Sequence, residues 1–149
     1  MFDETSKLKD AGAVTSSGYG EVDASPQVVN LGAGLVRGNV IIDVDAMVMQ
    51  GNDQLYGLHL IGGSDASFTQ EAALATLELG AKEVIEDDLD SKLARYVVPF
   101  ENEKNGIVYP FIRIRHEISG TSPSINYQAR LEKDLPIKGR IFSNTTTTT

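Results

Sequence analysis

Apolar and polar residues alternate over several segments of the chain, as they do in β-strands with one buried face. Residues 40–48 carry an apolar side chain at every second position. That row consists of Val40, Ile42, Val44, Ala46 and Val48. The alternation recurs in residues 55–61, 93–100, 108–118 and 125–132. Turn-forming Gly, Asn and Pro residues separate the segments, so the pattern predicts five long strands.

Two further segments are ambiguous or short. Residues 70–79 consist largely of good helix formers, and Thr69 is a candidate N-cap. Apolar and polar side chains nevertheless alternate from residue 74 to residue 79, so we expect a strand there. A short strand is expected over residues 28–31, ended by Gly32.

These elements together define a fold class. Alternating strands joined by polar turns, without a clear amphipathic helix, predict an all-β protein. We expect residues 28–135 to form one antiparallel jelly-roll β-sandwich. A chain of 149 residues has the usual size of one domain and can bury a core of its own.

The two ends of the chain differ from this domain in composition. Residues 1–27 are polar and rich in Gly, Ser and Asp, so we expect an extended N-terminal arm that becomes ordered only against a partner. Its apolar residues Phe2, Leu8 and Val14 are the anchors expected to contact that partner. Residues 136–149 end in five threonines, and we expect a flexible C-terminal tail.

The composition excludes several classes of function. The chain contains no cysteine, which excludes disulfides, thiolate metal sites and cysteine nucleophiles. Its formal net charge of −8 opposes binding to nucleic acid and to anionic lipid. Residues 1–12 lack the apolar stretch of a signal peptide, and no apolar run reaches the length of a membrane span. We expect a soluble protein that binds neither nucleic acid nor membrane.

The histidines and glycines give no pattern typical of a metal or nucleotide site. His59 and His116 are the only histidines, whereas a zinc site needs three or four ligands. His59 lies on the outer face of its predicted strand, and His116 lies in an apolar row, which indicates a core or interface histidine. The glycine-rich residues 31–38 lack the spacing of a dinucleotide-binding loop, and a strand follows them.

The carboxylates also lack a catalytic pattern. Asp87, Asp88 and Asp90 do not have the spacing of an EF-hand loop. Asp43 and Asp45 share a strand face that we interpret as exposed, whereas an acid–base pair needs a cleft and opposed pKa shifts. We therefore expect no catalytic residue, no metal site and no cofactor, and we expect that the protein is not an enzyme.

Three stretches, taken in order, resemble a known family. Residues 27–33 (QVVNLGA) are similar to an N-x-(I/V)-D-L-G-A stretch, with Asn30 in place of the usual Asp. Residues 60–69 (LIGGSDASFT) resemble an L-x-G-S-D-D-A-x-F-T stretch. Residues 94–97 and 111–114 resemble the two parts of an R-Y-(I/L)-R-L strand, here separated in the chain. The order and spacing resemble the capsid cement proteins of tailed bacteriophages, the family typified by the Bordetella phage cement protein.

The resemblance implies a specific role and location. It implies a jelly-roll sandwich that is assembled in the host cytoplasm and lies on the outer capsid surface of the virion. The partner would be the major capsid protein, whose adjacent capsomers the sandwich would bridge. Self-association is implied as well, with a dimer favoured over a trimer, and the family has no catalytic residues. Two alternatives remain: a component of the phage tail or of head completion, and a carbohydrate-binding β-sandwich module.

Overall fold

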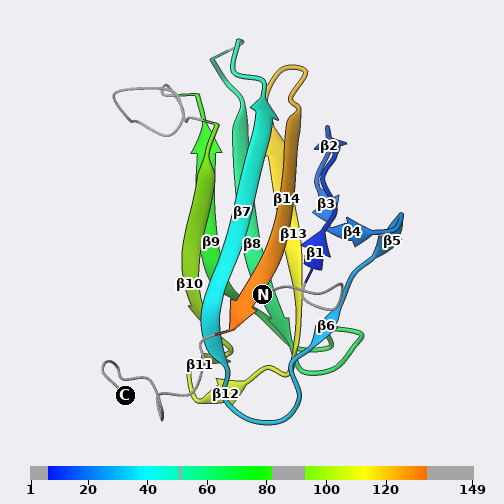
Figure 1. The fold of residues 1–149 in the computed structure, drawn as a ribbon, viewed down its shortest axis with the longest axis vertical. Coiled ribbons are helices and arrows are strands. Elements are labelled where there is room, and N and C mark those ends of the chain that lie inside the picture. Colours follow the sequence, from blue (N-terminus) through cyan, green and yellow to red (C-terminus); the bar gives the residue numbers. More distant parts are fainter. Residues whose placement is uncertain (1–6, 51, 82–92, 134–149) are drawn as a thin grey trace, which may run out of the picture.

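The computed structural model describes residues 7–50, 52–81 and 93–133. Two antiparallel sheets face each other, and their long strands run along the long axis of the molecule (Figure 1). Sheet A has the order β1 (Lys7–Lys9), β14 (Ile125–Lys133), β7 (Arg37–Met47) and β10 (Arg95–Glu101), with β2 (Ala13–Val14) also paired to β14. Sheet B has the order β3 (Gly18–Tyr19), β13 (Phe111–Ser119), β8 (Leu55–Gly63) and β9 (Glu71–Gly80), with β6 (Val29–Asn30) also paired to β13.

Two small antiparallel ribbons extend from this sandwich. The first joins β4 (Glu21–Val22) to β5 (Ser25–Pro26), and the second joins β11 (Glu103–Lys104) to β12 (Ile107–Val108). No helix occurs in the described residues. The all-β class and the antiparallel pairing predicted from the sequence are therefore confirmed.

The six long strands are β7, β8, β9, β10, β13 and β14, and they lie where the alternating segments predict them. The ambiguous segment also forms a strand, β9, as the alternation within residues 74–79 indicates. Only the β8–β9 connection stays within one sheet, whereas the other connections between consecutive long strands cross from one sheet to the other. Each sheet therefore combines segments that are far apart in the sequence.

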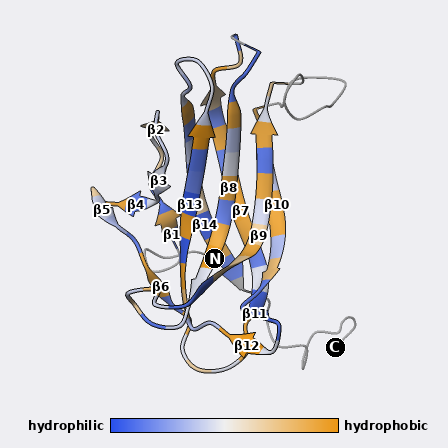
Figure 2. Ribbon diagram, turned by 180° about the vertical axis from the view of Figure 1, so that it is seen from behind, coloured by the Kyte–Doolittle hydropathy of each residue, from blue (hydrophilic) through white to orange (hydrophobic). Residues whose placement is uncertain are grey.

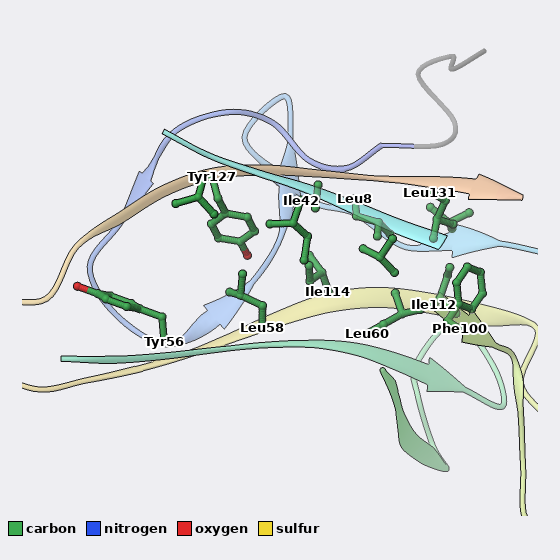
Figure 3. Packing of buried hydrophobic residues seen from close by; sticks show 14 of the residues in the cluster. Leu8, Ile42, Tyr56, Leu58, Leu60, Phe100, Ile112, Ile114, Tyr127 and Leu131 are labelled. Carbon is green, nitrogen blue, oxygen red and sulfur yellow. The ribbon is translucent and has the colours of Figure 1, made fainter. Parts of the chain in front are cut away.

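The core lies between the two sheets (Figure 3). Sheet A contributes an inward row that includes Ile42, Tyr127 and Leu131, and sheet B contributes Leu58 and Ile114 opposite them. These side chains are at most 3% exposed, and burying each one contributes roughly 1.5–3 kcal/mol of stability. The apolar rows seen in the sequence are thus the surfaces that hold the sheets together.

A β-bulge interrupts the inward row of β7. Asn126 pairs with Ala46 and Tyr127 pairs with Val44, so Asp45 has no partner in the pairing with β14. The extra residue shifts the alternation by one position. Ala46 is consequently exposed and Met47 packs against the core, so the expectation that Ala46 faces inward is wrong.

The described part of the expected N-terminal arm is folded onto the sandwich. Strands β1 and β2 pair with β14, and β3 pairs with β13, so this segment covers one edge of each sheet. Leu8 is fully buried in the core, and Val22 is 9% exposed. Backbone pairing with the sheet edges orders a segment that has few apolar side chains of its own.

Candidate interaction surfaces

The three predicted partner anchors lie in different environments. Leu8 is 0% exposed and belongs to the core cluster of its own chain, so its side chain is not available on the surface. Val14 is half-buried, pairs with Ile125 and packs against the same core. Phe2 lies outside the described residues. The structure therefore directs attention to other apolar side chains.

Three exposed apolar side chains lie at one end of the sandwich. Leu35 is 52% exposed, Ile107 is 42% exposed and Val108 is 40% exposed. The loop between β6 and β7 and the β11–β12 ribbon, which carry them, both lie at the lower end of the molecule in Figure 1, and β12 is strongly hydrophobic in Figure 2. We call Leu35, Ile107 and Val108 the apolar end.

The buried side chain of Asn102 fixes the two segments of the apolar end to each other. Asn102 is 0% exposed, and its Oδ1 accepts a hydrogen bond from the backbone N–H of Val36 at 2.8 Å. Its Nδ2 donates to the carbonyls of Gly34 at 3.2 Å and Tyr109 at 3.1 Å. Because one amide serves three backbone groups, the loop beside Leu35 is joined to the ribbon beside Ile107.

The turn of the β11–β12 ribbon is also well defined. Lys104 pairs with Ile107, which leaves Asn105 and Gly106 as a two-residue loop. Their φ angles are +53° and +82°, the left-handed values that Asn and Gly adopt at low cost in a type I′ turn. The Nζ of Lys104 donates to the carbonyl of Ala73 at 3.0 Å, which connects the ribbon to β9. The apolar end is thus presented on a rigid support.

The loop from β8 to β9 contains the G-S-D-x-x-F-T stretch singled out in the sequence. Both carboxylate oxygens of Asp65 accept hydrogen bonds: Oδ1 from the N–H of Ser67 and Thr69, and Oδ2 from Oγ1 of Thr69 at 2.8 Å. The hydroxyl and N–H of Thr69 hold the pKa of Asp65 below its usual value. Phe68 packs so closely over Gly63 that a side chain at Gly63 has no room. The stretch therefore encodes a loop structure.

Arg113 connects this loop to the N-terminal segment. Its guanidinium carbon lies 3.8 Å from the ring centre of Tyr19 and 3.9 Å from that of Phe68. Nη2 also lies 3.4 Å from a carboxylate oxygen of Glu71. Two aromatic faces and one carboxylate thus surround one cation. Sequence alternation placed Arg113 on the outer face of its strand but gave no sign of this stack.

A groove lies beside the N-terminal segment where this segment crosses between the edges of the two sheets. It has a volume of about 610 Å³, and its lining includes Lys9, Asp10, Ser16, Glu21 and His116. Most of the lining comes from residues 9–19, which cross from the edge of sheet A to the edge of sheet B. Two of the lining side chains, Lys9 and His116, are almost completely buried.

Lys9, His116 and Tyr127 form a buried polar cluster at this groove. Nδ1 of His116 lies 2.7 Å from the hydroxyl of Tyr127, and Nζ of Lys9 lies 4.3 Å from the centre of the Tyr127 ring. Burial, together with the positive charge of Lys9, lowers the pKa of His116 to about 4. Burial lowers the pKa of Lys9 to about 8 and raises the pKa of Tyr127 above its usual value. The expectation of a buried histidine at position 116 is confirmed.

The other titratable residues considered in the sequence make separate contacts. Nδ1 of His59 lies 3.0 Å from Oγ1 of Thr76, and its Nε2 lies 2.9 Å from Oε1 of Glu117. Asp43 binds Arg95 at 2.7 Å and Arg130 at 3.1 Å, and its side chain is only 14% exposed. Asp45 is exposed, as interpreted from the sequence, whereas Asp43 on the same outer face is half-buried because two arginines cover its carboxylate.

The described residues contain neither a cluster of metal-binding side chains nor a helix that could span a membrane. Within residues 7–50, 52–81 and 93–133, no group of three or more His, Asp or Glu side chains is arranged to hold a metal ion. The acidic residues Asp87, Asp88 and Asp90 lie outside the described part of the chain. Among the described residues, no helix has the length and apolar character of a membrane span.

Comparison with known proteins gives no family for the chain. No protein-family model matches its sequence, and no curated protein matches it. The geometry of the candidate surfaces is therefore the support for them. Of the residues that form them, Leu35, Ile107 and Lys9 were not singled out by the sequence pattern, because each matters only through neighbours distant in the chain.

Proposed function

We propose that the chain is a virion structural protein that cements the outer surface of a phage capsid, bridging adjacent copies of the major capsid protein. The sandwich would serve as a jelly-roll body, and its loops and outer faces would make the contacts. A protein in this role needs a rigid body and exposed binding surfaces, and it needs no reaction centre. The resemblance of residues 27–33 and 60–69 to the cement family is one support for this proposal.

The observation that carries the proposal is the apolar end. Exposed apolar side chains gathered in one place on a protein surface mark sites of protein–protein contact. Leu35, Ile107 and Val108 come from two segments that Asn102 holds together, so these segments are fixed relative to each other before any partner binds. Preorganisation of this kind reduces the entropy lost on binding. The apolar end is thus suited to dock on a protein surface.

The position of the family-like stretches agrees with this assignment. The loop that contains Asp65 and the loop that follows β6 both lie at the end of the sandwich that carries the β11–β12 ribbon (Figure 1). The hydrogen bonds of Asp65 and the packing of Phe68 give these residues a structural reason to be present. These loops therefore lie at the end of the sandwich where we propose the capsid contact.

A small contact is sufficient for a cement because it is repeated. A chain that self-associates as a dimer presents two apolar ends, and each second contact is made at a high effective concentration. The symmetric capsid then multiplies this bridging over its whole surface. The function therefore does not require a large interface on each copy.

The direct test is binding to phage heads that lack the protein. The wild-type chain is compared with the triple variant L35S/I107S/V108S. L93S is the matched control, because Leu93 is 54% exposed and precedes the first residue of β10, whereas the β11–β12 ribbon follows its last residue. We expect the wild type and L93S to bind and to raise the temperature at which the heads lose their DNA. The triple variant should bind at least tenfold more weakly.

Two results would contradict the proposal. The first is wild-type chain that remains unbound at saturating concentration, with heads no more heat-resistant than before. The second is a triple variant that binds as well as L93S, which would show that the apolar end does not contact the capsid. Circular dichroism of all three chains verifies that their folds are the same.

A further inference from the structure

We propose that Lys9, His116 and Tyr127 form an acid-sensitive latch that holds residues 7–24 against the edges of the two sheets. The latch is a property of the isolated chain, so it goes beyond capsid binding and does not depend on it. Protonation of His116 is the event that opens the latch, and release of the N-terminal segment is the result.

Lys9 makes the mechanical connection. Its Nζ donates hydrogen bonds to the carbonyls of Asp10 and Gly12 at 2.9 Å each and to the carbonyl of Tyr127 at 2.6 Å. The ammonium group has three protons, and each one has a carbonyl acceptor. Two acceptors belong to the N-terminal segment and one belongs to β14, so Lys9 ties the segment to sheet A.

The bond between Tyr127 and His116 depends on the protonation state of the imidazole. Tyr127 is 0% exposed, and burial raises the pKa of its phenol, so the hydroxyl keeps its proton. In the neutral tautomer that carries its proton on Nε2, Nδ1 of His116 accepts this proton across 2.7 Å. A proton on Nδ1 reverses this bond, because Nδ1–H then donates to the phenol oxygen and the hydroxyl proton of Tyr127 loses its acceptor. Protonation therefore leaves a donor without this partner in a buried site, where an unsatisfied donor is costly.

The surroundings of His116 oppose its positive charge. Lys9 of β1 places an ammonium group near the imidazole, and Tyr127 of β14 places a phenol beside it. Gly18 of β3 lies beside Nε2 of His116, and the apolar Leu58 of β8 pairs with His116. The carboxylates of Asp10 and Glu21 line the same groove and raise the pKa of Lys9, so they act mainly on the lysine. Asp10 is also bound to Lys7 and to the N–H of Asp23.

The direction of the pH effect follows from the two pKa values of His116. In the latched state the pKa is about 4, whereas a solvent-exposed histidine has a pKa of about 6.5. Between these values the open state binds a proton that the latched state does not, so the latched state loses stability as the pH falls. Below pH 4 His116 is protonated in both states, so the latched state loses no further stability through this histidine. The ratio of open to latched segment should rise on the order of 100-fold over this range.

The N-terminal segment is the part of the fold that this change releases. Strands β1 to β3 are two or three residues long, and Leu8 is the only side chain of residues 7–20 in the buried core cluster. By contrast, β13 and β14 pair along their length with β8 and β7. The groove of about 610 Å³ beside His116 gives water a place to hydrate the imidazolium once the segment lifts. Local opening therefore disrupts less structure than global unfolding does.

Two measurements on the full-length wild-type chain test the latch between pH 7 and pH 3. The first is the ¹⁵N chemical shift of the His116 imidazole, which reports its protonation. The second is amide hydrogen exchange, corrected for the intrinsic effect of pH, of residues 7–24 and of residues 55–61 in β8. We expect residues 7–24 to lose protection together with protonation of His116, while residues 55–61 remain protected.

Variants separate the latch from a general effect of acid. H116Q removes the titrating group and should abolish the acid-induced loss of protection in residues 7–24. H59Q is the matched control, because His59 is the other histidine and lies outside the groove, and it should behave as the wild type. Y127F keeps the ring beneath Lys9 but removes the hydroxyl, and it should raise exchange of residues 7–24 already at pH 7.

The latch is overturned by any of three results. One is protection of residues 7–24 that stays constant down to pH 3 in the wild type. Another is loss of their protection only together with residues 55–61. The third is an unchanged acid response in H116Q. If H116Q does not fold, the coincidence of the imidazole titration and segment exchange in the wild type still decides the matter.

Discussion

The guanidinium of Arg113 is held between the rings of Tyr19 and Phe68, at 3.8 Å from one ring centre and 3.9 Å from the other. Tyr19 belongs to the N-terminal segment, and Phe68 belongs to the loop that carries the family-like stretch. One side chain of sheet B thus connects two segments that are far apart in the sequence. Stacked cations of this kind stabilise a fold both through the electrostatic attraction and through the apolar area they cover.

Replacing Arg113 should therefore lower stability by a measurable amount. R113M retains much of the aliphatic length but loses the charge, and we expect it to reduce the free energy of unfolding by about 1–2 kcal/mol. R113K keeps the charge but lacks the planar group that stacks, so it should fall between R113M and the wild type. Urea denaturation of the three chains measures the difference. Equal stability of R113M and the wild type would show that the stack contributes nothing.

Gly63 is required by the position of Phe68. A Cβ at residue 63 would overlap the Phe68 ring, so G63A must displace the ring and should cost about 1–3 kcal/mol. F68L provides the control, because a smaller side chain leaves space for the added methyl group. In the F68L background, the effect of G63A should shrink to less than half of its value in the wild type. Additive effects of the two substitutions in a double-mutant cycle would contradict the packing described here.

Asn102 should be the most sensitive residue of the apolar end. N102A leaves the N–H of Val36 and the carbonyls of Gly34 and Tyr109 without their partner, and we expect a loss of about 2–4 kcal/mol. N30A is the matched control, because exposed Asn30 makes one hydrogen bond to the N–H of Gly32, and it should cost less than about 1 kcal/mol. Thermal unfolding compares the two variants. A similar loss in both would mean that Asn102 does not fix the end.

The carboxylate of Asp43 should make stability depend on pH. Hydrogen bonds from Arg95 and Arg130 hold the pKa of Asp43 below its ordinary value of about 4. A lowered pKa in the folded state contributes stability that is present above pH 4 and is lost as the pH falls through the pKa of the folded state. D43N should therefore be less stable than the wild type at pH 7, by about 1–3 kcal/mol.

The pH dependence and a neighbouring residue provide the control for Asp43. The difference between D43N and the wild type should shrink as the pH is lowered below 4, because the wild-type carboxyl then also becomes neutral. D45N should have little effect at any pH, since Asp45 is exposed and lies at the bulge. Chemical denaturation at several pH values measures all three chains. A difference that is independent of pH would exclude the charge of Asp43 as its cause.

The long strands were predictable because each has an apolar row long enough to define one buried face. In β13, for example, Ile112, Ile114 and His116 are buried and the residues between them are not. The bulge at Asp45 was not predictable, because alternation continues through it and the pairing register with β14 decides which side chain faces inward. Pattern therefore predicts strands better than it predicts where their register shifts.

The N-terminal segment could not be predicted from its own residues. Strands β1 to β3 are two or three residues long and exist because β13 and β14 offer unpaired edges. Lys9 is buried because carbonyls of its own turn and of Tyr127 satisfy its ammonium group. The polar composition of this segment predicts an extended arm. In the structure, hydrogen bonds to β13 and β14, which are distant in the sequence, hold the segment against the domain. The cluster that Lys9 and Tyr127 form with His116 could not be predicted from the sequence for the same reason.

The apolar end illustrates a third limit. Leu35 lies within a glycine-rich stretch, Val108 begins the long strand predicted over residues 108–118, and Ile107 precedes it. In the structure, β12 and β13 are separate, and the exposed residues of the ribbon lie at the same end as Leu35. Only the folding of the chain brings the two segments to the same end of the molecule.

Cryo-electron microscopy of phage heads carrying the protein tests the central proposal most directly. We expect density for the sandwich on the outside of the shell at the junctions between capsomers, with the loop of residues 31–36 and the β11–β12 ribbon facing the capsid. Heads without such density, or a ring of about six or twelve copies at a single vertex, would contradict a cementing role.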